Sequence, residues 1–230
     1  MKTAFVTGAN KGIGFAFAEE LLKKNFRVII GARDFKRGSD AVKALSKFGE
    51  VHLQLIDMAD MESIRAAAND IVKKFNDLVL LINNAGIAGD MHKVAWDFSS
   101  QELLDIYTVN FLGAFELTKD LLPLLERNHG RIINITMPTN ATELFHSLAY
   151  QASKAPLNVM IDNFAFEFAQ KKMSAQIFGI MPGVVSTDLN NHIQGAHVKT
   201  PAQSARQMIE FILSEENLNG KIINVEKIKE

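Results

Sequence analysis

The chain has 230 residues, of which 47% are hydrophobic, and its formal net charge at neutral pH is -1. This length and composition are typical of one globular domain with a sizeable core, which we expect to span residues 1–230. The near-zero charge, without a long basic block, argues against nucleic acid or an anionic membrane surface as the main partner.

Several other classes of protein are excluded by what the sequence lacks. It has no cysteine, which rules out disulfides and thiolate chemistry and fits a reducing compartment. The first apolar stretch ends at Thr7-Gly8, too early for a signal peptide, and no apolar run reaches about 18 residues. The six histidines form no helical pair or cluster with carboxylates that would hold a metal. We therefore expect a cytoplasmic protein that acts on a small molecule without a metal.

The chain begins with an apolar run, Thr3–Thr7, followed at once by a glycine-rich segment and an amphipathic pattern. This order predicts a strand, a glycine loop and a helix. Glycines let the backbone approach a pyrophosphate, and the helix N-terminus offers unpaired N–H groups to it. An ordinary glycine-rich turn is the alternative for the spacing alone. The residues of the predicted phosphate loop are Gly8, Asn10, Lys11, Gly12, Ile13 and Gly14.

A second predicted strand, Arg27–Gly31, ends where a dinucleotide-binding unit meets the adenosine ribose. An arginine at this place pairs with the 2′-phosphate of NADP, whereas a carboxylate accepts the ribose hydroxyl of NAD. Arg33 and Lys11 indicate NADP, and Asp34 is the competing signal for NAD. Asp34 precedes a polar stretch and a helix, so a capping or turn role is equally open for it.

The rest of the chain alternates between strand and helix patterns, which predicts a doubly wound, parallel, seven-stranded sheet with helices on both faces, a Rossmann fold. Pro123 is expected to kink or end its helix, and the stretch Leu189–Lys199 is expected to form a mobile lid or substrate loop. The further predicted strands are Val51–Ile56, Leu78–Ile82, Arg131–Thr136, Ala175–Ile180 and Lys221–Val225. The further predicted helices are Ala41–Lys47, Met61–Phe75, Gln101–Tyr107, Asn110–Arg127, one that carries Tyr150, and one that starts at Thr200-Pro201.

The segment Tyr150-Gln-Ala-Ser-Lys154 is the predicted reaction centre. Residues four apart in a helix lie on one face, so the phenol and the ammonium share one space. A lysine cation favours the phenolate and should bring the tyrosine pKa closer to a value useful for proton transfer. A tyrosine and a lysine at this spacing are also common surface residues. Further along, Phe164 and Phe168 share one face of this helix while Phe166 lies on another, which suits either a partner subunit, as in a dimer, or a covering loop.

These motifs together resemble those of the short-chain dehydrogenase/reductase family over essentially the whole chain. The motifs are Thr7-Gly8-x-x-x-Gly12-x-Gly14, Asn83-Asn-Ala-Gly86, Asn110, Tyr150-x-x-x-Lys154 and Pro182-Gly183. The segments around Lys11 and Arg33 resemble the NADP-using carbonyl reductases, and the short C-terminal part is similar to the C-factor and Sniffer-like members.

The resemblance implies a role for each matching residue. Tyr150 would give its proton to a carbonyl oxygen while a hydride passes from the nicotinamide to the carbonyl carbon. Lys154 would bond the nicotinamide ribose and lower the pKa of Tyr150, and Asn110 would hold a water that links Lys154 to solvent. The residues implied in cofactor binding beyond the phosphate loop and Arg33 are Asp57, Met58, Asn84, Ala85, Gly86, Tyr150, Lys154, Pro182, Gly183, Val185 and Thr187.

One position departs from the family pattern. The family has a serine about thirteen residues before the tyrosine, and this chain has Met137 there. Thr139 is the first candidate to replace the hydroxyl, with Thr136, His146 and Ser147 as further candidates. Loss of one donor to a developing oxyanion commonly costs about 10²–10³ in rate.

Two functions therefore remain open at the level of sequence. The first is an NADPH-dependent carbonyl reductase with a small carbonyl or alcohol substrate. The second is an NADP(H)-binding sensor or signalling protein with weak or no turnover. A pure scaffold would leave the phosphate loop and Arg33 without a role. Substrate choice is expected to depend on the loops at residues 87–96, 138–148 and 189–199.

Overall fold

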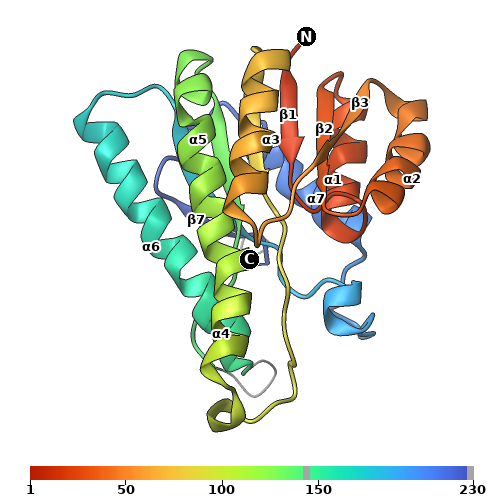
Figure 1. The fold of residues 1–230 in the computed structure, drawn as a ribbon, viewed down its shortest axis with the longest axis vertical. Coiled ribbons are helices and arrows are strands. Elements are labelled where there is room, and N and C mark those ends of the chain that lie inside the picture. Colours follow the sequence, from red (N-terminus) through yellow and green to blue (C-terminus); the bar gives the residue numbers. More distant parts are fainter. Residues whose placement is uncertain (142–145, 227–230) are drawn as a thin grey trace.

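The computed structural model describes residues 1–141 and 146–226, and within these residues seven parallel strands form one sheet. The strand order is β3-β2-β1-β4-β5-β6-β7, so the chain winds outward in both directions from β1 and β4 (Figure 1). The predicted doubly wound Rossmann fold is confirmed. The strands are Thr3–Val6 (β1), Arg27–Ala32 (β2), Val51–Leu55 (β3), Leu78–Asn83 (β4), Arg131–Ile135 (β5), Gln176–Met181 (β6) and Ile222–Asn224 (β7).

Helices cover both faces of the sheet, which is why its central strands are continuous apolar runs. Buried residues of α1, α2 and α7 pack on one face, and those of α3, α5 and α6 pack on the other (Figure 1). Because all strands are parallel, their carboxyl ends meet at one edge, which lies toward the bottom of Figure 1. The helices are Gly12–Lys23 (α1), Phe35–Leu45 (α2), Met61–Lys74 (α3), Ser100–Tyr107 (α4), Gly113–Arg127 (α5), Leu148–Gln170 (α6) and Pro201–Ile212 (α7).

The start of one helix and the effect of one proline differ from the sequence prediction. Helix α2 begins at Phe35 rather than at Ala41, because the carboxylate of Asp34 caps it by accepting the backbone N–H of Arg37 at 2.7 Å. Pro123 neither ends nor interrupts its helix, since α5 continues through it to Arg127. The predicted cap of the last helix is confirmed: Thr200 accepts the N–H of Gln203, and proline fills the first helical position.

The helices α4 and α5 are joined without a loop. Residues Thr108–Leu112 (η3) form one π-helical turn between them, and Asn110 lies buried in its middle. A π turn inserts one extra residue into the helical path, and such turns are frequent at functional sites. The sequence prediction treated the two helices as separate and placed Asn110 at the start of the second.

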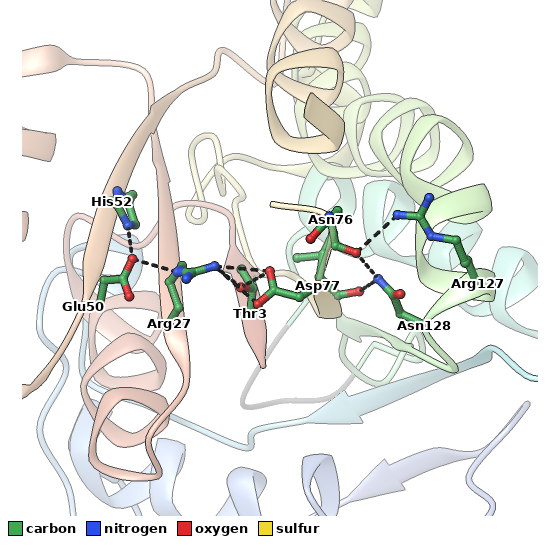
Figure 2. A network of polar contacts seen from close by, with 9 residues as sticks. Thr3, Arg27, Glu50, His52, Asn76, Asp77, Arg127 and Asn128 are labelled. Atoms are coloured by element: carbon green, nitrogen blue, oxygen red, sulfur yellow. Dashed lines mark hydrogen bonds and ion pairs between the residues drawn. The ribbon is translucent and has the colours of Figure 1, made fainter. Parts of the chain in front are cut away.

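The amino edge of the sheet is closed by a polar network (Figure 2). Arg27 on β2 donates to Glu50 at 2.7 Å and to both carboxylate oxygens of Asp77, at 3.2 and 3.3 Å. Thr3 on β1 donates to Asp77 at 2.8 Å. Asn128, after α5, donates to the carbonyls that precede and begin β4. Four strands and one helix are therefore tied together at the edge opposite the strand ends that carry the predicted site.

Of the two uses predicted for the second apolar side of α6, a covering loop is not found. Phe168 is buried and Phe164 is half-buried, whereas Phe166 is 63% exposed, so no described residue covers it. A partner subunit at this position stays a prediction.

Candidate cofactor and active site

The glycine loop after β1 leaves no room for side chains at two positions. Gly8 has φ +63°, and a Cβ there would lie 2.9 Å from the Cα of Ala85. A Cβ on Gly14 would lie 2.5 Å from both the carbonyl oxygen of Gly8 and the side-chain amide nitrogen of Asn84. Contacts this short with backbone exclude any residue larger than glycine. The loop therefore offers bare backbone at the N-terminus of α1, as a pyrophosphate requires.

The strand ends beneath this loop are held by side-chain bonds between β1 and β4. The hydroxyl of Thr7 accepts the N–H groups of Asn84 and Ala85, both at 3.0 Å. The Asn84 side chain donates back to the carbonyl of Thr7 at 2.9 Å. One residue earlier, Asn83 donates to Asn134 at the end of β5 at 3.0 Å. Thr7, Asn83 and Asn84 therefore tie the ends of β1, β4 and β5 together.

The corner where the adenosine ribose would lie carries positive and negative side chains. Arg33 is exposed just after β2, and Asp34 beside it is engaged as the cap of α2. Arg37, on the first turn of α2, lines a hollow of about 600 Å³ together with Asn10 and Lys11. Sequence reasoning missed Arg37, although its place one turn after Arg33 is visible in the sequence. Lys11 and Arg37 are the cations that a 2′-phosphate could meet in this hollow, which Asp40 and Asp188 also line.

Lys154 is a buried residue of α6 whose side chain reaches the end of β5. Its Nζ donates to the carbonyl oxygen of Ile135 at 2.9 Å and lies 5.9 Å from the centre of the Tyr150 ring. The predicted common face of Tyr150 and Lys154 is thereby confirmed. Burial lowers the pKa of Lys154 to about 8 and raises the pKa of Tyr150 to about 12. The predicted lowering of the Tyr150 pKa is wrong, because desolvation by burial raises it.

Asn110 is fixed beside this pair by the π turn. Its Oδ1 accepts the N–H of Ile87 at 2.8 Å, and its Nδ2 donates to the carbonyl of Ile87 and to the hydroxyl of Ser153, each at 2.8 Å. A Cβ on Gly86 would lie 3.1 Å from Asn110 Oδ1 and 3.7 Å from Lys154 Nζ. Asn110 and Lys154 are therefore neighbours across Gly86. Ser153 was not predicted, and the water proposed for Asn110 stays a prediction.

None of the candidate hydroxyls is marked out by its contacts as the replacement for the family's serine. Met137 is half-buried, and Thr139 is exposed. The hydroxyl of Thr136 donates to Asn158 on α6 at 2.7 Å, so it is engaged elsewhere. Ser147 is buried, and among the described residues its hydroxyl has no hydrogen-bond partner. His146 is exposed, while residues 142–145 of this predicted substrate loop lie outside the described residues.

The segment after β6 folds back against the glycine loop. Pro182 and Gly183 end the strand, and the Pro182 carbonyl accepts Lys199 Nζ at 3.0 Å. Val185 is buried and forms an isolated bridge with Lys199. Thr187 lines a hollow of about 350 Å³ with Gly12. The contacts of these residues to a cofactor stay a prediction.

Asp57 and Met58, which the family resemblance implies in cofactor binding, lie just after β3. Met58 is buried against α5, where a Cβ on Gly113 would lie 2.4 Å from the Met58 carbonyl oxygen. Asp57 is half-buried, and its carboxylate accepts the N–H of Ala59 at 2.9 Å.

Across the parts of the chain that the structure describes, no helix combines the length and the hydropathy needed to span a membrane.

Comparison with known proteins matches residues 2–197 to the family model described as short chain dehydrogenase. The chain is 32% identical over 190 residues to the 3-oxoacyl-[acyl-carrier-protein] reductase of Haemophilus influenzae, covering 82% of this chain and 76% of that protein. It is 40% identical over 137 residues to carbonyl reductase [NADPH] 1 of Mus musculus, covering 58% of this chain and 48% of that protein.

Solved structures share the fold over nearly the whole chain. The NADPH-bound carbonyl reductase from chicken fatty liver superposes with a TM-score of 0.87 at 26% identity, covering 98% of this chain and 97% of the other. An alcohol dehydrogenase from Thermococcus sibiricus, complexed with 5-hydroxy-NADP, superposes with a TM-score of 0.86 at 23% identity, covering 97% and 95%.

Proposed function

Because the chain belongs to the short-chain dehydrogenase family, we propose that it is an oxidoreductase that uses NADPH to reduce a small carbonyl compound to its alcohol, or the reverse. The observation that carries this proposal is the group formed by the buried Lys154 and Asn110 and the half-buried Tyr150 at the carboxyl edge of the sheet. Burial of a lysine destabilises the folded state, so stability does not explain why Lys154 is buried beside Tyr150.

The protein's own groups supply the proton in this reaction. With a pKa of about 12, Tyr150 is protonated at neutral pH and can donate to a carbonyl oxygen. With a pKa of about 8, Lys154 is mostly an ammonium at neutral pH and stabilises the phenolate that donation leaves behind. NADPH, when bound, supplies the hydride that the carbonyl carbon receives. A proton from solvent then restores Tyr150.

The preference for NADP over NAD is supported by the cations near the adenosine corner. Lys11, Arg33 and Arg37 lie in this region, and Lys11 and Arg37 line a hollow that also carries Asp40 and Asp188. The carboxylate of Asp34, which would be the ribose ligand for NAD, already caps α2. The carbonyl reductase from chicken fatty liver, which shares this fold, is bound to NADPH, and this supports the same assignment.

An NADP(H)-binding sensor with little turnover is the second candidate, and one observation favours it. Met137 stands in the place of the serine, and the adjacent Thr136 hydroxyl is held by Asn158. Without a second donor, the substrate oxygen would depend on Tyr150 alone, at a cost of about 10²–10³ in rate. The reductase and the sensor differ in turnover and share cofactor binding.

The test is NADPH oxidation by the purified protein with a panel of aldehydes, ketones, quinones and 3-ketoacyl thioesters. For a reductase, Tyr150→Phe should lower the rate by about 10²–10⁴ while NADPH still binds. Tyr107→Phe is a matched control, because it removes the hydroxyl of the chain's other tyrosine, which lies at the end of α4 with its ring tilted against that of Phe111. Wild-type protein that binds NADPH but oxidises it with none of the substrates would favour the sensor.

A further inference from the structure

The segment that follows β6, residues 184–199, forms a closed strap. Its base is a pair of backbone bonds, from Ser186 N–H to the Lys199 carbonyl at 2.9 Å and from Lys199 N–H to the Val184 carbonyl at 3.0 Å. Inside it, the Asn190 side chain accepts the N–H of Thr187 at 3.0 Å and donates to the Val185 carbonyl at 3.0 Å. Asp188 is therefore presented from a turn that is fixed on both sides.

Asp188 ties this strap to the glycine loop. Its Oδ2 lies 2.5 Å from Nζ of Lys11, a residue 177 positions earlier, and its Oδ1 lies 2.8 Å from Nε2 of His192. The bond from Lys11 holds the pKa of Asp188 below its usual range. The strap and the loop are close here, because a Cβ on Gly12 would lie 3.7 Å from a methyl carbon of Thr187.

Asp188 lies between two hollows at the predicted cofactor crevice in the sense that it lines both of them, whereas Lys11 lines one. Asp188 lines both the hollow of about 350 Å³ near Thr187 and the hollow of about 600 Å³ at the adenosine corner. The charged residues around the second hollow are Lys11, Arg37, Asp40 and Asp188. The carboxylate of Asp188 thus contacts the same ammonium that a 2′-phosphate would use.

We propose that Asp188 is an internal competitor of the 2′-phosphate of NADP, holding Lys11 until the phosphate takes its place. This inference rests on the proposed use of NADP. A carboxylate in contact with Lys11 partly neutralises the positive charge of its ammonium and also repels an incoming phosphate. A nucleotide without the 2′-phosphate does not need Lys11, so Asp188 narrows the difference in affinity between the two cofactors. Binding of NADP also breaks one tie of the strap.

The expected size of the competition follows from the exposure of the pair. The side chains of Lys11 and Asp188 are 55% and 51% exposed. Ion pairs as exposed as this are usually weak, and their loss changes an equilibrium by about fivefold at most. We therefore expect Asp188→Asn to tighten binding of a 2′-phosphorylated nucleotide by about threefold to fivefold.

The experiment compares adenosine 2′,5′-bisphosphate with AMP by calorimetry, using wild type and Asp188→Asn. These probes differ only in the 2′-phosphate and undergo no turnover. Asp70→Asn is the matched control, because Asp70 is 48% exposed and pairs with Lys74 on α3. We expect Asp188→Asn to strengthen the bisphosphate alone, and Asp70→Asn to change neither affinity. In a Lys11→Met background, Asp188→Asn should lose its effect.

Three results would overturn the competition. The first is an unchanged affinity of Asp188→Asn for the bisphosphate, and the second is an equal gain for AMP. The third is a gain that persists in Lys11→Met, because the carboxylate would then act through the general field and not through Lys11. Wild type that binds the two probes equally would instead remove the NADP assignment, and the competition with it.

Discussion

The buried Lys154 is expected to make the folded protein less stable at neutral pH than a neutral residue of similar size. Its pKa falls from 10.5 to about 8. Each pKa unit corresponds to about 1.4 kcal/mol, so ionised Lys154 costs the folded state about 3 kcal/mol. Lys154→Met removes this cost but leaves the Ile135 carbonyl without its donor, at about 1–3 kcal/mol. The variant should therefore be more stable at pH 7, by up to about 2 kcal/mol.

The dependence on pH is the sharper part of this prediction. A lysine whose folded pKa is lowered carries its full penalty below that pKa, and the penalty disappears as pH rises toward the unfolded value. Above pH 8, the free energy of unfolding of wild type should therefore rise relative to that of Lys154→Met by about 1.4 kcal/mol per pH unit, up to about 3 kcal/mol. The loss of the bond to Ile135 is a constant offset and does not affect this slope.

Urea unfolding of both proteins between about pH 7 and pH 10.5 measures the difference directly. Lys171→Met is the control, because the Lys171 side chain is 68% exposed and its effect should not vary with pH in this way. A difference between wild type and Lys154→Met that stays constant over this range would refute the reasoning. Burial would then not be what sets the pKa of Lys154.

Three further predictions concern the site and the opposite edge of the sheet. Gly14→Ala should weaken NADPH binding, measured by titration, at least about tenfold, because its Cβ would lie 2.5 Å from the Gly8 carbonyl oxygen. Unchanged affinity would contradict the proposal that the glycine loop binds the cofactor. Met137→Ser should raise kcat by about 10²–10³ at saturating NADPH if a donor is missing, and no rise would mean that another group already fills the role. Arg27→Met should cost about 1–3 kcal/mol in urea unfolding, because it leaves Asp77 without its cation, with NADPH affinity as the unchanged reference.

The features that were predictable from sequence depend on local geometry. The glycine loop is recognisable because each backbone requirement falls within a few residues, from Gly8 to Gly14. The common face of Tyr150 and Lys154 follows from the helical period alone. The order of strands and helices follows in the same way from the alternation of apolar patterns.

The features that were missed depend on contacts between distant parts of the chain. The pair of Lys11 and Asp188 joins residues 177 positions apart, and the bond between Thr136 and Asn158 crosses from β5 to α6. The pKa of Tyr150 was misjudged for the same reason, because a neighbouring charge is visible in the sequence whereas burial is a property of the folded chain. The start of α2 was ambiguous because Asp34 suits both a ribose ligand and a cap.

The π turn at residues 108–112 makes the position of Asn110 depend on the length of one helix. Successive residues of an α-helix are rotated by about 100°, since a turn takes about 3.6 residues. Deleting one residue from the turn would restore an unbroken α-helix and rotate α4 by that angle against α5. The sheet and its core would be untouched, yet Asn110 would no longer face Ile87. The position of Asn110 beside Lys154 thus depends on a single-residue insertion, so the proposed proton transfer could be lost by a deletion in this turn while the sheet remains folded.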